Sequence, residues 1–364
     1  MQMTTRGWKA LAVAGVVTLS SVGVGLAPAW VGQPDPVLVP VAFPASEDRA
    51  VVVDHPARAA ALSEARTTQR LAAVRASRLA ERQAAKKAAE LAANAKANAK
   101  RIAAREAAAV EAAAETARAE APYDFVLSAF NILGSNHTAP GGDASGFAPG
   151  RVRTEWAVDL IAQHGSSIVG WSEIQSDQLS AVMRSTGGQF EAWPGFTLGA
   201  KGVPASMMWR TSEWRAITKK TVDIPFVGQT RPMPYVELEN VATGRRIWVM
   251  SVHNAPNDRS AERNVAESRE LAIVRDLVKT GLPVFFLGDM NEKAEIFCEV
   301  TGTTSLVSAS GGSNDGTCRP PSGMRVDWIF GSRNAQFSEY RADRSPAVAR
   351  VTDHAVIVTR VTVP

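Results

Sequence analysis

The chain has 364 residues, of which 45% are hydrophobic, so it is longer than one average domain and can bury a sizeable core. Its formal net charge of +4 is unevenly distributed. Residues 55–121 carry 13 Lys and Arg against 7 Glu, whereas residues 122–364 carry 24 Lys and Arg against 25 Asp and Glu. The C-terminal part is therefore not a basic nucleic-acid-binding module by bulk charge, although a local basic rim is compatible with these numbers.

The N-terminus has the charge order of an export signal. Arg6 and Lys9 precede an uncharged stretch from Ala10 to Gly32, and Ala27-Pro28-Ala29 resembles a small-x-small cleavage site. The stretch is also long enough to span a bilayer, so residues 1–32 are either a removed signal peptide or a retained membrane anchor. Both interpretations predict a protein that is secreted or anchored on the outer face of the cytoplasmic membrane.

Two further segments precede the main α/β part. Residues 33–54 are rich in proline and valine and lack a helical period, which predicts a linker. Residues 55–121 contain 29 alanines interleaved with Arg, Lys and Glu. Because alanine has the highest helix propensity, this segment predicts one long helix that Pro122 ends.

The function of that helix is left open by its pattern. Its larger apolar residues keep no heptad, which disfavours a strong coiled coil. We interpret it as a solvated spacer. The alternative is a basic helix that associates with a membrane or with anionic polymers of the cell envelope. No pattern in the sequence calls for an obligate oligomer.

From residue 122 onward, strand-like and helical patterns alternate. Helical patterns occupy Arg153–His164 and Ser260–Lys279. Apolar strand-like runs recur at 124–132, 166–172, 205–210, 235–240, 246–253, 284–288, 326–330 and 355–363. This order predicts one mixed α/β domain, residues 122–364, with two stacked sheets flanked by helices.

Short polar motifs lie where several of these strands end. A buried strand holds a carboxylate or an imidazole only at high cost, so polar residues repeated at strand ends indicate one shared cleft. Carboxylates, amides and imidazoles in one set suit a hard divalent cation and a phosphate. The set comprises Asn131, Glu173, His253, Asn254, Asp289, Asn291, Asp327, Asp353 and His354. It predicts metal-assisted hydrolysis of a phosphoester.

The order Asn … Glu … His … Asp-x-Asn … Asp … Asp-His resembles the endonuclease/exonuclease/phosphatase superfamily. That superfamily includes pancreatic-type deoxyribonuclease, abasic-site endonucleases, inositol polyphosphate phosphatases and neutral sphingomyelinases. The resemblance covers residues of about 124–362 and rests on GDMN at 288–291, VDWIF at 326–330 and TDH at 352–354. It implies a four-layer α/β/β/α sandwich of two mixed sheets, with Mg²⁺ at the open end and Mn²⁺ or Ca²⁺ as alternatives.

Chemistry and resemblance together assign a role to each position. Glu173 is expected to bind the metal, Asn131 to support the ion or its water shell, and Asp353 to lie near it. Asp289 is expected to orient or deprotonate the attacking water, and Asn291 to donate a hydrogen bond to the phosphate.

The two histidines of the set are expected to face the phosphate. His354 would sit on the scissile phosphate as an imidazolium, because a hydrogen bond to Asp327 favours the charged form. His253 would contact a phosphate oxygen or protonate the leaving group. The other three histidines are expected to be surface or loop residues: His55, His137 and His164.

The sequence departs from the superfamily pattern at four places, one of them Leu133, where some abasic-site enzymes carry an acidic residue. Ser172 stands where a Gln commonly precedes the metal-binding Glu, and Asn254-Ala255-Pro256 follows His253 where many members have Leu. Deoxyribonuclease-like members pair the first histidine with a glutamate, and the nearest match, residues 203–210, contains no acidic residue. These departures leave the hydrolytic set intact but argue against assignment to one subfamily.

Cys298 and Cys318 are the only cysteines, and both are expected in a loop rich in Gly, Ser and Asn. In an exported protein they predict one disulfide rather than two free thiols or a metal site.

The sequence as a whole predicts an exported magnesium-dependent phosphodiesterase, with a nuclease as the leading hypothesis. The alternatives are a phosphatase or sphingomyelinase-like hydrolase of a small phosphoester or lipid headgroup, and a surface interaction protein with a relict site.

Overall fold

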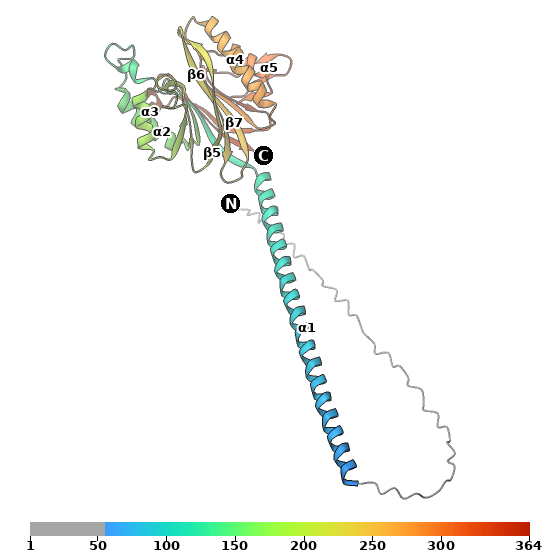
Figure 1. The fold of residues 1–364 in the computed structure, drawn as a ribbon. Coiled ribbons are helices and arrows are strands. Elements are labelled where there is room, and N and C mark those ends of the chain that lie inside the picture. Colours follow the sequence, from blue (N-terminus) through green and yellow to red (C-terminus); the bar gives the residue numbers. More distant parts are fainter. Residues whose placement is uncertain (1–54) are drawn as a thin grey trace, which may run out of the picture. The chain divides into compact units, whose positions relative to one another are not determined.

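The computed structural model describes residues 55–364 (Figure 1). The predicted signal or anchor at 1–32 and the linker at 33–54 lie outside the described residues. By its internal contacts the chain divides into two units, Met1–Ala89 and Glu90–Pro364, so the division falls inside a continuous helix. The boundary predicted at residues 121–122 therefore stays a prediction. Across residues 55–364, no helix combines the length and the apolar character needed to cross a membrane.

The long helix α1 spans His55–Glu120, 66 residues, as the alanine content predicts (Figure 1). Every side chain from Pro56 to Glu120 is exposed, including Leu62 and Val110. The helix is therefore stabilised by the propensity of its residues rather than by tertiary packing.

Residues 123–364 form two six-stranded sheets, each of them mixed. The first contains, in spatial order, β13 (Gln336–Asp343), β14 (Val356–Val363), β1 (Tyr123–Asn131), β2 (Ile168–Ser172), β4 (Met207–Arg210) and β3 (Phe190–Trp193). The second contains β5 (Trp214–Phe226), β6 (Gln229–Asn240), β7 (Arg246–His253), β8 (Val284–Asp289), β12 (Asp327–Ser332) and β9 (Leu306–Ser308). Only the central pairs β1–β2 and β7–β8 run parallel among the pairings of these two sheets. Their strands are buried almost throughout, as apolar runs such as VFFLGD predict.

Helices cover the outer faces of both sheets, which gives the predicted α/β/β/α order of layers (Figure 1). Leu127 of β1 and Leu287 of β8 belong to the apolar cluster between the sheets. On the first sheet, α2 (Gly150–His164) packs through residues such as Leu160, together with α3 (Ser176–Ser185). On the second sheet, α4 (Ser260–Val278) packs through residues such as Leu271, together with α5 (Ala294–Thr303).

Several elements were not predicted by the periodicity of the sequence. Helices α3 and α5 were missed, and Cys298 lies in α5 rather than in a loop. Strand β5 was missed because it is an edge strand whose Lys219 and Lys220 face solvent, so its apolar pattern is interrupted. Strand β6 begins at Gln229 rather than at residue 235, since Pro232 and Pro234 are tolerated inside it.

The predicted disulfide between Cys298 and Cys318 is confirmed. It joins α5 to β11 (Cys318–Arg319), which forms a two-stranded sheet with β10 (Ser313–Asn314), and the two Cα atoms lie 5.6 Å apart. The remaining short elements are α6 (Pro346–Ala349) and the 3₁₀ helices η1 (Ser135–Thr138) and η2 (Val203–Ala205).

The central strands bring their ends to one edge of the sandwich. Asn131 of β1 pairs with Ser172 of β2, and Asp289 of β8 pairs with both His253 of β7 and Asp327 of β12. Gly288 permits this approach, because a Cβ atom there would lie 2.0 Å from the carbonyl oxygen of Val252. Polar groups from both sheets therefore meet at this edge.

Candidate active site

Asn131 connects the two sheets at the centre of the site. It is fully buried, and its Nδ2 donates hydrogen bonds of 2.9 Å both to Glu173 Oε1 and to Asp289 Oδ2. Its Oδ1 accepts the backbone N–H of Leu133 at 3.0 Å, which fixes the orientation of the amide. Asn131 thus sets the distance between a carboxylate of the first sheet and a carboxylate of the second.

A group of possible metal ligands surrounds this amide. One ligand atom each from Glu173, Asp289 and His354 lies within 4.8 Å of the other two. Asp289 is 1% exposed, and burial together with the charge of Asp327 raises its pKa, so a bound cation would stabilise its ionised form. The two carboxylates at this spacing fit a divalent cation, and His354 lies beside them. Asp353, the other predicted neighbour of the metal, is exposed and lies outside this group.

Glu173 is held from three sides. Besides Asn131, the backbone N–H of Gly134 donates to its Oε2 at 3.3 Å, and His137 Nε2 lies 3.2 Å from the same oxygen. Burial alone would raise the pKa of Glu173, but the hydrogen bonds from His137 and Asn131 outweigh it and hold that pKa below its usual range. The carboxylate is therefore ionised and oriented before any cation binds.

His354 and Asp327 are in direct contact, as the sequence pattern predicts. His354 Nδ1 lies 2.8 Å from Asp327 Oδ2, and Nε2 lies 3.4 Å from Asn131 Nδ2. Burial would lower the pKa of His354, but the hydrogen bond and the charge of Asp327 raise it to about 10. His354 is therefore an imidazolium whose Nε2 faces the metal ligands.

His253 has a different electrostatic environment. It is 2% exposed, and burial lowers its pKa to about 3. Arg231 Nη1 lies 3.4 Å from its Nδ1, and Nε2 lies 3.6 Å from Asp289 Oδ2. Because a guanidinium can only donate, Nδ1 is the unprotonated nitrogen and Nε2 carries the proton. A neutral imidazole that donates from Nε2 fits contact with a phosphate oxygen better than protonation of the leaving group.

Asn291 connects the segments after β7 and β8. Its Nδ2 donates to the carbonyl oxygen of Asn254 at 2.8 Å, and its backbone N–H donates to Asp289 Oδ1 at 3.1 Å. The side-chain amide of Asn291 was predicted to donate to the phosphate. One of its two N–H groups instead donates to the neighbouring segment. Asn254 in turn donates from Nδ2 to Glu270 Oε2 of α4 at 3.2 Å.

Three residues near the site were missed by the sequence analysis. The first is Arg231, which stacks on Phe226 with 3.5 Å between the guanidinium carbon and the ring centroid. Phe226 also contacts His253 edge-on, with 4.8 Å between the ring centroids. A single arginine ahead of the predicted run 235–240 gave no signal, since the pairing of β6 with β7 brings it beside His253.

The second missed residue is Arg153, whose side chain is fully buried although it lies on α2. Its guanidinium holds the loop after β1 and the segment before β14. The acceptors are the carbonyl oxygens of Ile132, Leu133, Gly134, Ala148 and Val351 and the hydroxyl of Thr138. Position 153 lies seven residues before Leu160 and so on the same face of α2, but an arginine in the sequence gives no sign of being buried there.

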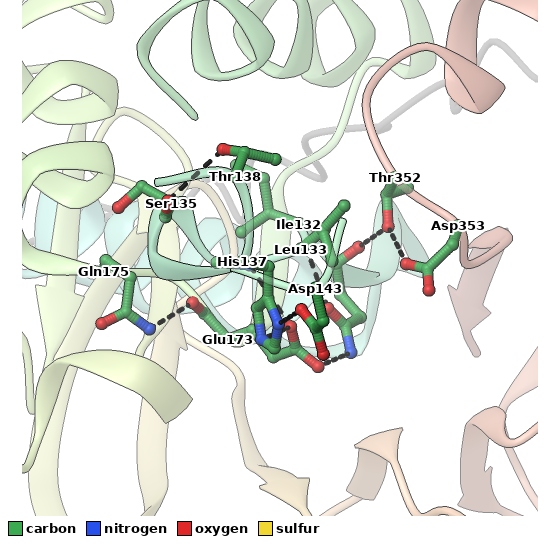
Figure 2. Close-up of polar contacts among 12 residues, drawn as sticks. Ile132, Leu133, Ser135, His137, Thr138, Asp143, Glu173, Gln175, Thr352 and Asp353 are labelled. Atoms are coloured by element: carbon green, nitrogen blue, oxygen red, sulfur yellow. Dashed lines mark hydrogen bonds and ion pairs between the residues drawn. The ribbon is translucent and has the colours of Figure 1, made fainter. Parts of the chain in front are cut away.

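The third is His137, which was expected to be a surface or loop residue. It lies in η1, and its ring is placed between Asp143 and Glu173 (Figure 2). Its pKa is raised to about 9, chiefly by the hydrogen bond to Glu173. His164, by contrast, pairs with Asp343 at 2.9 Å, away from the strand ends that form the site.

Left-handed backbone follows three of the strands that form the site. Leu133, Glu173 and Asn291 have φ values of 57°, 65° and 51°. Non-glycine residues occupy this region at a cost of about 1–3 kcal/mol, and such residues cluster at functional sites. The packing around the strand ends therefore holds these residues in strained conformations.

A basic cavity of about 190 Å³ adjoins the Asp327–His354 pair. Lys293, Arg325 and Arg344 line it together with these two residues and Asp353. Within the described residues 55–364, none of the three cations forms an ion pair. The local basic rim that bulk charge left open is therefore present beside the site.

No protein-family model and no curated protein sequence matches the chain. Solved structures do match it. The endonuclease/exonuclease/phosphatase from Bacteroides vulgatus is 15% identical with a TM-score of 0.53, over 66% of this chain and 98% of that chain. An endonuclease/exonuclease/phosphatase family protein from Bacteroides thetaiotaomicron is 14% identical with a TM-score of 0.52, over 67% and 99%.

The catalytic domain of human Nocturnin, solved with a bound sulfate anion, is 15% identical with a TM-score of 0.50, over 65% of this chain and 94% of that chain. At these identities the likeness establishes the fold. The resemblance stated from the sequence is confirmed at that level: the two-sheet sandwich has the endonuclease/exonuclease/phosphatase fold.

Proposed function

We propose, from this fold and the polar groups at its open edge, that the protein is an exported magnesium-dependent phosphodiesterase and that it acts as a nuclease. One observation carries the proposal. One oxygen each of Glu173 and Asp289 and one ring nitrogen of His354 lie within 4.8 Å of one another, and Asp327 contacts His354. Carboxylates that bind a cation beside an imidazolium are suited to a phosphoester with its negative charge.

Each side chain of the site has a definable task. Glu173 and Asp289 would hold the divalent cation, which when bound supplies positive charge to the phosphate oxygens. His354 presents Nε2 to the phosphate, while Asp327 retains the proton on Nδ1 and keeps the ring charged. Asp289 also faces the position of an attacking water, and the backbone N–H of Asn291 fixes its Oδ1. His253 and Arg231 provide further donors on the other side of the phosphate.

The basic cavity favours nucleic acid as the substrate. Lys293, Arg325 and Arg344 surround a space beside His354, where they can contact phosphates that flank the scissile one. A lone phosphomonoester would leave these cations unused. The near-neutral charge of residues 122–364 supports the second candidate, a small phosphoester or a lipid headgroup.

The test is hydrolysis by the purified protein in Mg²⁺ of plasmid DNA, RNA, sphingomyelin and bis(p-nitrophenyl) phosphate. We expect cleavage of a nucleic acid, and loss of turnover by orders of magnitude in Glu173→Gln with the fold retained. Cleavage of sphingomyelin alone would favour the second candidate. Full activity of Glu173→Gln would refute the metal assignment.

A charge-reversal pair tests the role of the cavity. Arg344→Glu should lower kcat/KM on DNA strongly but change it little on bis(p-nitrophenyl) phosphate. Arg333→Glu is the control, because Arg333 is exposed and follows the opposite end of β12 from Asp327. Equal losses on both substrates would remove the argument for flanking phosphates.

Export is part of the proposal and is tested separately. The N-terminal signal predicts that the protein is recovered outside the cytoplasmic membrane, either released or attached to it. Cell fractionation with N-terminal sequencing of the recovered protein distinguishes cleavage after residue 29 from retention as an anchor. A cytoplasmic pool with an intact N-terminus would contradict export.

A further inference from the structure

His137 is set apart from the other residues near the site by its two carboxylate partners. Its Nδ1 lies 2.7 Å from Asp143 Oδ1, and its Nε2 lies 3.2 Å from Glu173 Oε2 (Figure 2). The Asp143 side chain is 80% exposed, whereas that of Glu173 is 20% exposed. The imidazole therefore connects a solvent-facing carboxylate to the proposed metal ligand.

The loop that carries His137 is built tightly. The backbone N–H of Ala144 donates to the carbonyl oxygen of His137 at 2.9 Å, so the chain folds back over the histidine. Gly142 makes this approach possible, because a Cβ atom there would lie 2.2 Å from that same oxygen. On the other side, Ser135 Oγ donates to Asp177 Oδ1 at 2.7 Å, which ties η1 to α3. These contacts hold the loop, and with it His137, in position.

The arrangement of the ring is the one that metal-binding histidines adopt. Such a histidine donates one ring N–H to a carboxylate or carbonyl, which fixes the tautomer and points the other nitrogen at the metal. Asp143 accepts from Nδ1 in this way; Nε2 donates to Glu173 Oε2 in the structure and would release that proton when it binds the ion. Two ligand atoms at about 2.1 Å from one ion and at right angles lie about 3 Å apart. The observed 3.2 Å matches that separation.

We propose that His137 is a nitrogen ligand of the cation that Glu173 binds, with Asp143 as the partner that orients the imidazole. The proposal rests on the proposed function in so far as that function includes a divalent metal at Glu173. Its chemical consequence is a preference among metals. An imidazole ligand favours Mn²⁺, Co²⁺ or Zn²⁺ over Mg²⁺, which takes oxygen ligands and retains its waters.

The test is calorimetric titration of the full chain with Mn²⁺ and with Mg²⁺, which needs no substrate. We expect H137Q to lower the affinity for Mn²⁺ by at least about tenfold and the affinity for Mg²⁺ by less than about threefold. D143N should lower Mn²⁺ affinity less, because the ligand itself remains. H164Q is the matched control, since His164 also pairs with an aspartate but lies away from Glu173, and both affinities should be unchanged.

A second measurement detects the bond between the metal and the His137 nitrogen directly. Pulsed electron paramagnetic resonance of Mn²⁺ bound to the ¹⁵N-histidine-labelled chain should show a nitrogen coupling that weakens in H137Q and persists in D143N and H164Q. Equal losses of Mn²⁺ and Mg²⁺ affinity in a folded H137Q protein would show that His137 only orients Glu173, and would overturn the proposal. An unchanged coupling in H137Q would do the same.

These outcomes are separable from failure of the proposed function. A chain that binds Mn²⁺ through His137 but cleaves no nucleic acid contradicts the nuclease assignment and leaves this inference intact. A wild-type chain that binds neither ion contradicts both. If H137Q is poorly folded, the labelled wild-type chain decides the matter, because the absence of any nitrogen coupling to Mn²⁺ in it would overturn the proposal.

Discussion

Arg153 is a buried cation that has no carboxylate at hydrogen-bond distance among the residues the structure describes. Its guanidinium instead donates to backbone carbonyl oxygens of the segment that follows Asn131 and of the chain before His354. A buried carbonyl left without a donor costs about 1–3 kcal/mol. The geometry of the site therefore depends on a residue that touches neither metal nor substrate.

We expect Arg153→Met to lower the free energy of unfolding by roughly 3–5 kcal/mol, since several carbonyl oxygens lose their donor at once. Urea denaturation measures this change. Arg151→Met is the control, because Arg151 lies on the exposed face of the same helix and pairs only with Glu155, so its loss should cost less than about 1 kcal/mol. Similar losses in the two variants would contradict the role assigned to Arg153.

Glu270 gives the molecule a pH dependence that does not involve the metal ligands. It is fully buried, burial raises its pKa to about 8, and the charged group that interacts with it is Glu267 on the same helix. Its Oε1 and Asn254 Oδ1 are both buried without a partner. A proton on Glu270 would make the carboxyl a donor and allow both oxygens to be satisfied.

The sign of the effect follows from the raised pKa. The folded state binds the proton more tightly than the unfolded state, so the stabilisation is complete below about pH 4.5 and is lost as pH rises through about 8. We expect Glu270→Gln to raise Tm at pH 8 and to flatten the decline of Tm between pH 5 and 9. A wild-type Tm that stays constant over this range would contradict a protonated Glu270.

At the scale of elements, α1 contributes no group to the site. Its side chains from Pro56 to Glu120 are exposed, and within the described chain the possible metal ligands all lie beyond residue 122. We expect deletion of residues 55–118 to leave kcat/KM on bis(p-nitrophenyl) phosphate unchanged within about twofold. A large loss on this small substrate would mean that the helix completes the site.

The same deletion separates the two interpretations of the helix. Sedimentation with vesicles that contain anionic lipid should be unchanged by the deletion if α1 is a solvated spacer. It should decrease if the basic residues of α1 bind an anionic surface.

The disulfide stabilises the segment that leads from α5 towards β12. It links positions separated by 20 residues, and closure of a loop of this size is worth about 3 kcal/mol if it acts on the unfolded chain. We expect a reductant to lower Tm of the wild type but not of the C298S/C318S double variant. Non-reducing peptide mapping of exported protein should recover the linked peptides, and two free thiols would contradict the bond.

The central strands could be predicted from the sequence because the residues that they bury are consecutive apolar residues. The run VFFLG has no polar side chain, and Asp289, which follows it, marks the strand end. Asn131, Glu173, Asp289 and His354 were found in this way. The fold followed from their order once the resemblance was recognised.

The residues that were missed act through contacts that no local pattern encodes. His137 and Arg153 are placed by a loop and a helix whose positions depend on tertiary packing. Arg231 reaches His253 through the pairing of β6 with β7. The basic cavity likewise assembles Lys293, Arg325 and Arg344 from three separate segments. Their chemistry could be read in the sequence, but their proximity could not.

At the scale of the whole molecule, the hydrogen bonds from Asn131 to Glu173 and to Asp289 determine when the site is assembled during folding. Glu173 belongs to one sheet and Asp289 to the other, and His354 is brought to them only by the C-terminal strand of the first sheet. A nascent chain therefore has no competent centre until its last strand has docked. Copies that end before residue 354 would lack His354, so the proposed hydrolysis would require the docked C-terminal strand.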